Sequence, residues 1–292
     1  MLNTYLRLLS TIRNVIDATV GLPGQLWSGV DYSRMNRIFS ALTLLPLVIG
    51  TVWFLPPLAT LVLGEVVLLL AFREYASLAT GFGASLPRSV VAVGVVATAA
   101  AVVFEVAVVV QIASLLTIGI VTLTTGRRGG HMLIDVASSF FPVLYLGLPI
   151  GALMAIRTSV GREAVVLLLM ITMISDTAQY YGGRWLGRTP LAPAISPKKT
   201  VEGALFGLVA GTAPIFLVAI PALSHLAALQ LALLGVAIVG LGIAGDLFES
   251  KLKRGAGIKD ASSLIPGHGG MLDRIDSLLF AAPGFYLFLR LA

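Results

Sequence analysis

Long apolar segments separated by short polar stretches dominate the chain. A helix needs about 20 mostly apolar residues to cross a bilayer, and nine segments come close to or exceed that length: residues 38–56, 58–79, 88–104, 106–126, 133–156, 164–183, 201–221, 227–249 and 271–291. Pro56 and Pro57 separate the first two segments, and Glu105 marks a tight turn between the third and fourth. Pro142 and Pro149 predict a kink or break in the fifth. The pattern predicts an all-α, polytopic integral membrane protein with about nine transmembrane helices.

Composition supports this interpretation. The chain of 292 residues is 57% hydrophobic and 12% charged, whereas a soluble domain carries roughly 25% charged residues. The absence of cysteine excludes disulfides, thiolate metal sites and cysteine nucleophiles. A net charge of +6 can indicate a nucleic-acid partner, but in a membrane protein we attribute it to cytoplasmic loops and anionic lipid. No nucleic-acid partner is expected.

The basic residues indicate an orientation. One set of alternate loops comprises the N-terminal segment and residues 73–88, 126–132, 184–200 and 250–274. This set contains 17 of the 20 Lys and Arg residues, and the other side carries only Arg157, Arg162 and Arg290. Because cytoplasmic loops are enriched in Lys and Arg, we expect a multi-pass protein of the cell (inner) membrane with a cytoplasmic N-terminus. No internal repeat is obvious, which disfavours inverted-repeat transporters.

The chain divides into three regions. Residues 1–36 lack a secretory signal, and apolar positions recur at helical spacing in Leu2, Leu6, Leu9, Ile12 and Ile16. We expect an amphipathic N-terminal segment on the membrane surface; a helix packed on the protein's own loops fits equally well. Residues 37–157 form the N-terminal transmembrane helices, and residues 158–292 form the C-terminal catalytic transmembrane region.

Acidic residues near three helix ends are the main candidates for chemistry, because ionisable groups within spans are costly and by default indicate function. Asp176 lies late in the sixth segment, Asp246 and Glu249 late in the eighth, and Asp273 and Asp276 early in the ninth. The predicted topology puts all three ends on the cytoplasmic side, at similar depth. The last two pairs are spaced i, i+3, so each lies on one helix face. Two such pairs facing one cavity would suit a bridging Mg²⁺.

An alternative stays open for these acids. They could form structural ion pairs with Lys253, Arg254 or Arg274, or Asp273 could serve the N-terminus of its own helix. Glu65 lies deeper in the second segment and has no assignable partner. For Arg73 and Glu74, at a cytoplasmic helix end, we expect snorkelling or ion pairing.

Two basic loops and a glycine-rich loop accompany the acids. The stretch APAISPKKTVEG places Ser196, Lys198, Lys199 and Thr200 just before a helix, where an anion can bind; the lysines could equally serve topology alone. The stretch SKLKRGAGIKD adds Lys251, Lys253, Arg254 and Lys259. The glycines of PGHGG could let backbone N–H groups cradle a phosphate, although no Walker A pattern is present. His268 could contact phosphate, shuttle a proton or cap the helix. The residues together suggest metal-dependent chemistry between a polyphosphate and a lipid at the cytoplasmic face.

Two motifs carry a resemblance to a known family. The residues Ser250–Arg254, Lys259–Asp260 and Ile265–Asp276 resemble the defining motif of the phosphatidate cytidylyltransferases, the CDP-diacylglycerol synthases. The stretch SDTAQYYGGRWLGRTPLAPAISPKKTVEG is similar to their second characteristic stretch, with departures at Gln179 and Gly182. The resemblance implies transfer of CMP from CTP to phosphatidate, giving CDP-diacylglycerol and pyrophosphate for phospholipid biosynthesis. It also implies a divalent cation, a homodimer, and metal ligation at Asp246 and Asp273 with Asp276 close by.

The candidate site follows from the residues and the resemblance together. Catalytic candidates are Asp246, Asp273, Lys253, Arg254, Lys259, Asp260, His268 and Arg274. Substrate-binding candidates are Asp176, Ser196, Lys198, Lys199, Thr200, Gly267, Gly269 and Gly270. Metal candidates are Asp246, Asp273 and Asp276, with Mg²⁺ as cofactor and a second, monovalent cation left open. The expected partners are CTP, phosphatidate with other membrane lipids, and a second copy of the chain.

Three other functions remain open. The same machinery could act on an ether lipid or a polyprenyl phosphate, because the sequence does not reveal the acyl pocket. A CTP-dependent lipid kinase would transfer the γ-phosphate instead. An ion-coupled transporter would place its acids near the bilayer midplane, whereas the acids here cluster toward one end of the predicted helices.

Overall fold

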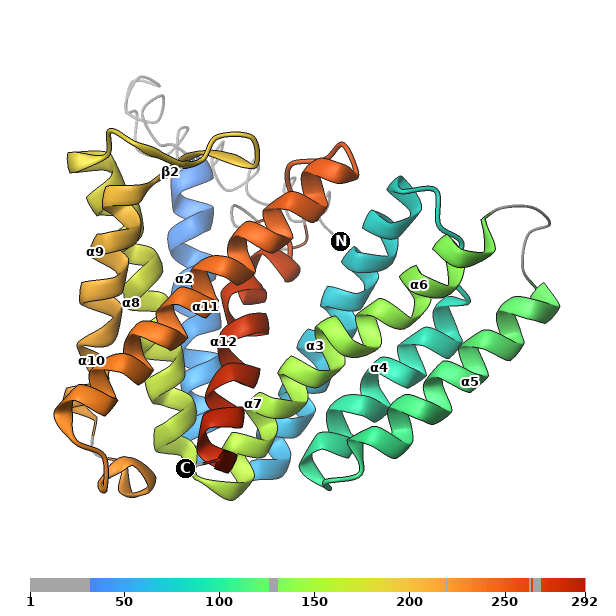
Figure 1. Ribbon diagram of the computed structural model, residues 1–292, viewed down its shortest axis with the longest axis horizontal. Coiled ribbons are helices and arrows are strands. Elements are labelled where there is room, and N and C mark those ends of the chain that lie inside the picture. The colour runs from blue at the N-terminus through green and yellow to red at the C-terminus, as the bar shows by residue number, and fades with distance from the viewer. Residues whose placement is uncertain (1–31, 126–130, 219, 263, 265–268, 292) are drawn as a thin grey trace, which may run out of the picture.

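The computed structural model describes residues 32–125, 131–218, 220–262, 264 and 269–291 (Figure 1). Helices form almost all of this part of the chain. In order they are α2 (Tyr32–Phe54), α3 (Pro57–Gly81), α4 (Arg88–Val103), α5 (Ala107–Thr125), α6 (Met132–Pro142), η1 (Val143–Gly147), α7 (Leu148–Ser159), α8 (Arg162–Leu186), α9 (Val201–Thr212), α10 (Pro214–Leu217), η2 (Pro221–Leu223), α11 (Ala228–Gly255) and α12 (Leu272–Leu291). Every predicted apolar segment overlaps one of these helices or a run of consecutive ones. The predicted amphipathic segment lies, over residues 1–31, outside the described residues.

The predicted breaks between segments are confirmed. Helix α2 ends at Phe54 and α3 begins at Pro57, where a proline at the first helical position needs no N–H partner. Glu105 turns the chain between α4 and α5 with φ 61°. Between Pro142 and Pro149 the helix continues through η1, a π-helical turn, so the predicted kink appears as a local change of hydrogen bonding rather than as a break.

A β-hairpin is the one departure from the all-α prediction within the described residues. Strand β1 (Pro190–Ala192) pairs antiparallel with β2 (Ser196–Thr200), with Pro190 opposite Thr200. The hairpin fills most of the loop between α8 and α9. It carries both lysines of the predicted anion site on a defined strand instead of a free loop.

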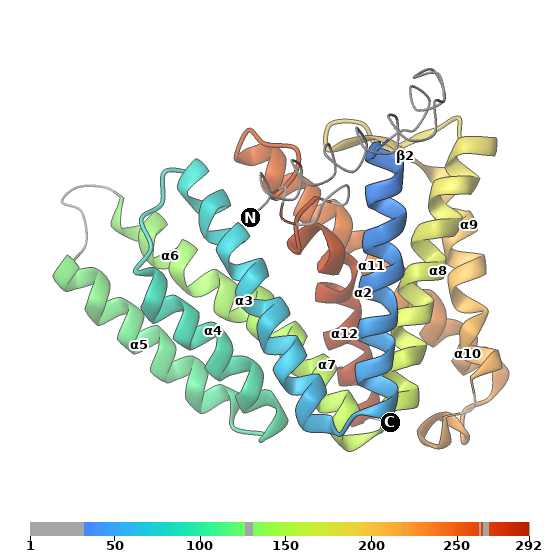
Figure 2. The ribbon, with the colours of Figure 1, turned by 180° about the vertical axis from the view of Figure 1, so that it is seen from behind.

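Two apolar cores meet at α12. One core joins α3, α4 and the α6–α7 run, and includes Leu272 and Leu279 from the first half of α12. The other joins α8, α10 and α11, and includes Phe285 from the second half. Figures 1 and 2 show α12 between the two groups of helices. The helix that carries two of the candidate acids is therefore held by both halves of the chain.

The helices have the composition of membrane spans. Within the described residues, four helical stretches are long and apolar enough to cross a bilayer: Ala107–Thr124, Met132–Ser159, Arg162–Leu186 and Ala228–Gly255. Only 17% of the first stretch is buried inside the protein. An apolar surface of this kind is unfavourable in water and suits lipid. The chain is thus an all-α membrane protein with a small β-hairpin at one end.

Candidate functional site

Close packing of α11 on α12 builds the centre of the site. A Cβ added at Gly245 would lie 2.5 Å from the backbone oxygen of Asp276, so only glycine lets the two helices approach this closely. The adjacent residue, Asp246, therefore comes near Asp276. The hairpin, the end of α11 and the start of α12 lie at the same end of the molecule (upper in Figure 1).

Three carboxylates form the first group of the site, which we call the acid cluster: Asp176, Asp246 and Asp276. Lys199 lies beside them. Asp276 is close enough to Asp246 and Asp176 to interact with both electrostatically. Lys199 pairs with the Oδ2 atom of Asp246. The Ser277 hydroxyl donates to Asp176 Oδ2 at 3.3 Å and lies 3.5 Å from Asp276 Oδ1. The predicted convergence of α8, α11 and α12 is therefore seen in the structure.

A second group surrounds Lys253, which is buried between α11 and α12. Its Nζ atom lies 2.5 Å from Glu249 Oε2 and 2.5 Å from Asp273 Oδ1. The other oxygen of Asp273 accepts the N–H of Gly270 at 2.8 Å and that of Ala261 at 3.3 Å. Both alternatives left open by the sequence thus occur at Asp273: it forms an ion pair, and it accepts a backbone N–H at the start of its own helix.

The acid cluster suits a divalent cation better than Asp273 does. Within the described part of the chain, no group of three or more His, Cys, Asp or Glu side chains has the arrangement of a complete metal site. Mg²⁺ does not require one, because it keeps several waters and often binds through one or two carboxylates. Asp246 and Asp276 fit that requirement by their proximity. Asp273 would join them only by exchanging its contact with Lys253.

The hairpin places the side chain of Lys199 next to the acid cluster. Lys199 is partly buried against Asp246, whereas Lys198 is exposed. The Thr200 hydroxyl accepts the Gly203 N–H at 3.1 Å and so caps α9. Arg254 Nε donates to the backbone oxygen of Ile195 in the hairpin turn at 3.4 Å. Ser196 begins β2 and is partly buried.

Some of the other predicted site residues are exposed, and some lie outside the described residues. Lys259, Asp260 and Arg274 are exposed. Gly269 adopts φ 81°, a left-handed conformation that glycine favours. Gly267 and His268 lie outside the described residues, so their predicted roles stay predictions.

Glu74 is the main residue that the sequence interpretation missed. The prediction of snorkelling is wrong for Glu74: the residue is 5% exposed. Among the described residues its carboxylate accepts the N–H of Met271 at 2.9 Å and that of Leu272 at 2.7 Å. The Ser262 hydroxyl donates to the same carboxylate at 2.6 Å. No periodic or motif signal in the sequence links α3 to the start of α12, so this contact could not have been found from hydropathy.

Sequence signals did exist for other contacts. Glu249 is fully buried and pairs with Lys253, and its i, i+4 spacing to that lysine is typical of helical ion pairs.

Gln179 and Gly182, the two departures from the family stretch, lie at the contact of α8 with α9. A Cβ at Gly182 would lie 2.6 Å from Phe206 Cβ, and one at Gly207 would lie 2.4 Å from Gln179 Cγ. Both residues therefore lie where α8 packs closely on α9.

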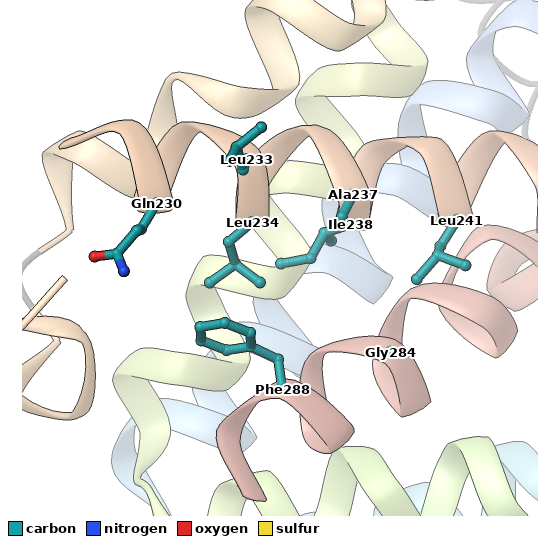
Figure 3. A pocket seen from close by; sticks show the side chains of 8 residues that line it. All are labelled: Gln230, Leu233, Leu234, Ala237, Ile238, Leu241, Gly284 and Phe288. Atoms are coloured by element: carbon teal, nitrogen blue, oxygen red, sulfur yellow. The ribbon is translucent and has the colours of Figure 1, made fainter. Parts of the chain in front are cut away.

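An apolar groove of about 350 Å³ lies between α11 and α12. Figure 3 shows Leu234, Ile238 and Leu241 from α11 facing Gly284 and Phe288 of α12. Leu241 is five residues before Asp246, about 7.5 Å along the helix. The groove therefore continues the helix–helix contact that carries the acids, toward the opposite end of the molecule.

Comparisons with known proteins show the family to which the chain is similar. The model of a family described as the cytidylyltransferase family matches residues 35–292. A phosphatidate cytidylyltransferase of Helicobacter pylori is 40% identical over 154 residues, which cover 52% of this chain and 57% of the relative. One of Aquifex aeolicus is 40% identical over 148 residues, covering 51% and 53%. One of a Synechocystis species is 45% identical over 135 residues, covering 45% and 44%. The chain thus matches about half the length of these relatives.

Proposed function

The chain belongs to the cytidylyltransferase family, whose model matches residues 35–292, and we propose that it transfers CMP from CTP to phosphatidate. The products would be CDP-diacylglycerol and pyrophosphate, for phospholipid biosynthesis. Relatives named phosphatidate cytidylyltransferase support this choice of substrates. The observation that carries the proposal is the acid cluster with Lys199 beside it, at one end of an apolar helical protein.

The proposed reaction needs positioning more than proton transfer. The phosphate of phosphatidate is already an anionic nucleophile, because the second pKa of a phosphate monoester is about 6. One of its oxygens would form a bond to the α-phosphorus of CTP while the bond from that phosphorus to the bridging oxygen breaks, and pyrophosphate leaves in line. The protein must hold two anions together and stabilise the charge that develops.

Cationic side chains would hold the phosphates. Lys199 lies against Asp246, so a phosphate bound by this lysine would meet the acid cluster directly. Arg254 connects α11 to the hairpin and would keep Lys198 and Lys199 near the end of α11. The remaining proposed contacts are Ser196, Thr200, Lys259 and Arg274, together with the backbone at Gly267, Gly269 and Gly270.

Mg²⁺ is the proposed cofactor, held by Asp246 and Asp276, with Asp273 as a further ligand. When bound, it would neutralise the negative charge of the triphosphate. Asp176 and Ser277 lie beside these carboxylates and would fix their orientation. Asp273 is held toward α11 by Lys253, and it would bind the ion by exchanging that contact.

The lipid substrate requires an apolar surface next to the acids. We place one acyl chain in the groove between α11 and α12 (Figure 3), because its lining is apolar and it continues the same helix–helix contact. The acyl chain of the lipid would then enter the groove from the side, from within the membrane.

We further propose the orientation and assembly expected from the sequence. About nine transmembrane helices would place the N-terminus, the hairpin and the acid cluster at the cytoplasmic face of the cell (inner) membrane. The charge bias of the loops supports this orientation. Residues 37–157 would act as the N-terminal transmembrane part and residues 158–292 as the catalytic part, in a homodimer.

One assay tests the proposed reaction. Purified protein in detergent is incubated with Mg²⁺, phosphatidate and CTP labelled at the α-phosphate. We expect the label to appear in the lipid, with one pyrophosphate released per lipid formed. Asp246→Asn and Asp273→Asn should both abolish turnover while the protein still folds. The thermal unfolding midpoint should fall in Asp273→Asn, because that variant leaves the buried Lys253 without one of its two carboxylate partners. Near-normal rates in both variants would contradict the proposed metal ligands.

Other results of the assay would identify a different function. Label that remains in CDP would indicate a lipid kinase. Turnover with an ether-lipid or polyprenyl phosphate but not with phosphatidate would keep the chemistry and change the substrate. Absence of turnover with every lipid phosphate would support an ion-coupled transporter instead.

A further inference from the structure

The carboxylate of Glu74 binds the segment that leads into α12. It accepts hydrogen bonds from two consecutive backbone N–H groups, at Met271 and Leu272, and from the hydroxyl of Ser262. These donors are separated from Glu74 by 188 to 198 positions in the sequence. The contact therefore connects α3, in the N-terminal half of the chain, with the loop and helix that carry Asp273 and Asp276.

The surroundings are shaped to receive this carboxylate. A Cβ at Gly270 would lie 2.5 Å from Glu74 Oε2, so glycine at that position leaves the space that Glu74 occupies. A buried charge is costly unless hydrogen bonds compensate for it, and here three donors do so. The first N–H groups of a helix have no partner within the helix and favour negative charge. Glu74 thus supplies, from another helix, the hydrogen-bond acceptor that a capping residue usually supplies from the start of the same helix.

The position of the contact determines what it holds in place. Leu272 is followed directly by Asp273, whose carboxylate binds Lys253 and the N–H of Gly270. Asp276 follows one helical turn later and belongs to the acid cluster, with Asp246 and Asp176 nearby. We infer that Glu74 is a positioning residue: it fixes the start and the rotation of α12, and thereby the placement of Asp273 and Asp276. The catalytic consequence of this inference rests on the proposed cytidylyl transfer, whereas the structural consequence does not.

The test compares Glu74→Gln with the parent protein by two measurements. The first is amide hydrogen exchange of residues 269–276. We expect at least about tenfold faster exchange there, because hydrogen bonds to a charged group are strong and the amide NH₂ of Gln opposes a backbone N–H. The second is the kcat of the transfer and the Mg²⁺ concentration that gives half-maximal activity. We expect kcat to fall by about 10- to 100-fold or the Mg²⁺ requirement to rise similarly, as for other residues that orient metal ligands.

Two variants make the comparison specific. Glu163→Gln removes an exposed carboxylate that pairs with Arg162 at the start of α8, and it should leave both measurements unchanged. Glu74→Asp keeps the charge on a shorter side chain and should restore part of the protection and of kcat. A purely structural role for Glu74 would lower the amount of folded protein without changing the Mg²⁺ requirement of the folded fraction.

Several outcomes would overturn the inference. One is parent-like exchange at residues 269–276 in Glu74→Gln. Another is faster exchange there with unchanged kcat and Mg²⁺ requirement in a protein that shows the transfer. If Glu74→Gln does not fold, Ser262→Ala removes a single donor and should show the same changes at smaller size; parent-like behaviour of that variant would also overturn the inference. If the parent protein shows no transfer, the proposed function fails, and the exchange measurement still decides whether Glu74 holds α12.

Discussion

At the scale of single residues, Lys253 serves two carboxylates at once. Glu249 is 0% exposed, and Lys253 is the cation paired with it, at 2.5 Å. Breaking a buried ion pair by removing one partner typically costs about 3–5 kcal/mol, because the remaining charge is left buried without compensation. The same lysine binds Asp273. The predicted catalytic role of Lys253 is therefore combined with a structural role.

We expect Lys253→Met to lower the free energy of unfolding by about 3–5 kcal/mol, measured by denaturant unfolding in detergent. The double variant Lys253→Met with Glu249→Gln should be more stable than Lys253→Met alone, because it leaves one carboxylate, that of Asp273, without its cation instead of two. Lys251→Met, at an exposed position of the same helix, is the matched control and should change stability little. Equal stability of the Lys253 and Lys251 variants would show that the pair contributes nothing.

The residues of the site could be predicted only in part. Hydropathy and the charge bias of the loops together place Asp246, Asp273 and Asp276 at the same end of the predicted spans, and the family resemblance implies metal ligation at Asp246 and Asp273. These signals do not identify their individual partners: Asp246 pairs with a hairpin lysine and Asp273 with Lys253 and backbone N–H groups. Such contacts depend on the angles and rotations at which helices pack, and these are set by side-chain shape rather than by the apolar pattern.

At the scale of elements, glycines determine how closely α8, α9 and α11 pack. A Cβ at Gly211 would lie 2.8 Å from Ser175 Cβ and 2.8 Å from Val239 Cγ2, whereas one at Gly240 would meet nothing within 4 Å. Small residues at helix contacts are the usual means of close packing in membranes. Gly211 thus holds α9 between α8 and α11, and with it the hairpin that carries Lys199.

These two glycines give a matched pair of variants. Gly211→Ala should destabilise the protein, because overpacking typically costs about 1–3 kcal/mol and exceeds the gain in helix propensity of about 1 kcal/mol. Gly240→Ala should be neutral or stabilising, since it has the propensity gain alone. The thermal unfolding midpoints of the two variants in detergent make the comparison. A midpoint for Gly211→Ala at or above that of Gly240→Ala would contradict the packing role.

The elements themselves were largely predictable, with two instructive exceptions. Pro56 and Pro57 predict one helix boundary, because proline does not continue a helix, and Glu105 predicts another, because a charged residue interrupts the apolar pattern there. The π-helical turn after Pro142 appeared in the sequence only as an expected kink. The β-hairpin was expected as an irregular loop, because strands of three and five residues are too short to show an alternating pattern.

At the scale of the whole molecule, α12 unites two cores. Its first turns pack with α3 and the α6–α7 run, and its last turns pack with α8 and α11. A division of the chain near residue 157 therefore separates the helices by sequence but leaves the last helix in contact with both parts. The turns of α12 that carry Asp273 and Asp276 therefore pack in the core that includes α3 and the α6–α7 run.

The proposed orientation can be tested with single cysteines, because the natural sequence has none and no background residue must be removed. Ser85 lies between α3 and α4, on the proposed cytoplasmic side, and Ser224 lies between η2 and α11, on the opposite side; both are exposed. With a membrane-impermeant maleimide applied to intact spheroplasts, Ser224→Cys should be labelled at once. Ser85→Cys should be labelled only after the membrane is permeabilised. The reverse labelling pattern would show that the topology is inverted. The acid cluster would then lie outside the membrane, away from the CTP of the cytoplasm. Labelling of both variants in intact spheroplasts would mean that the two loops share one side, which requires a different number of membrane crossings between them.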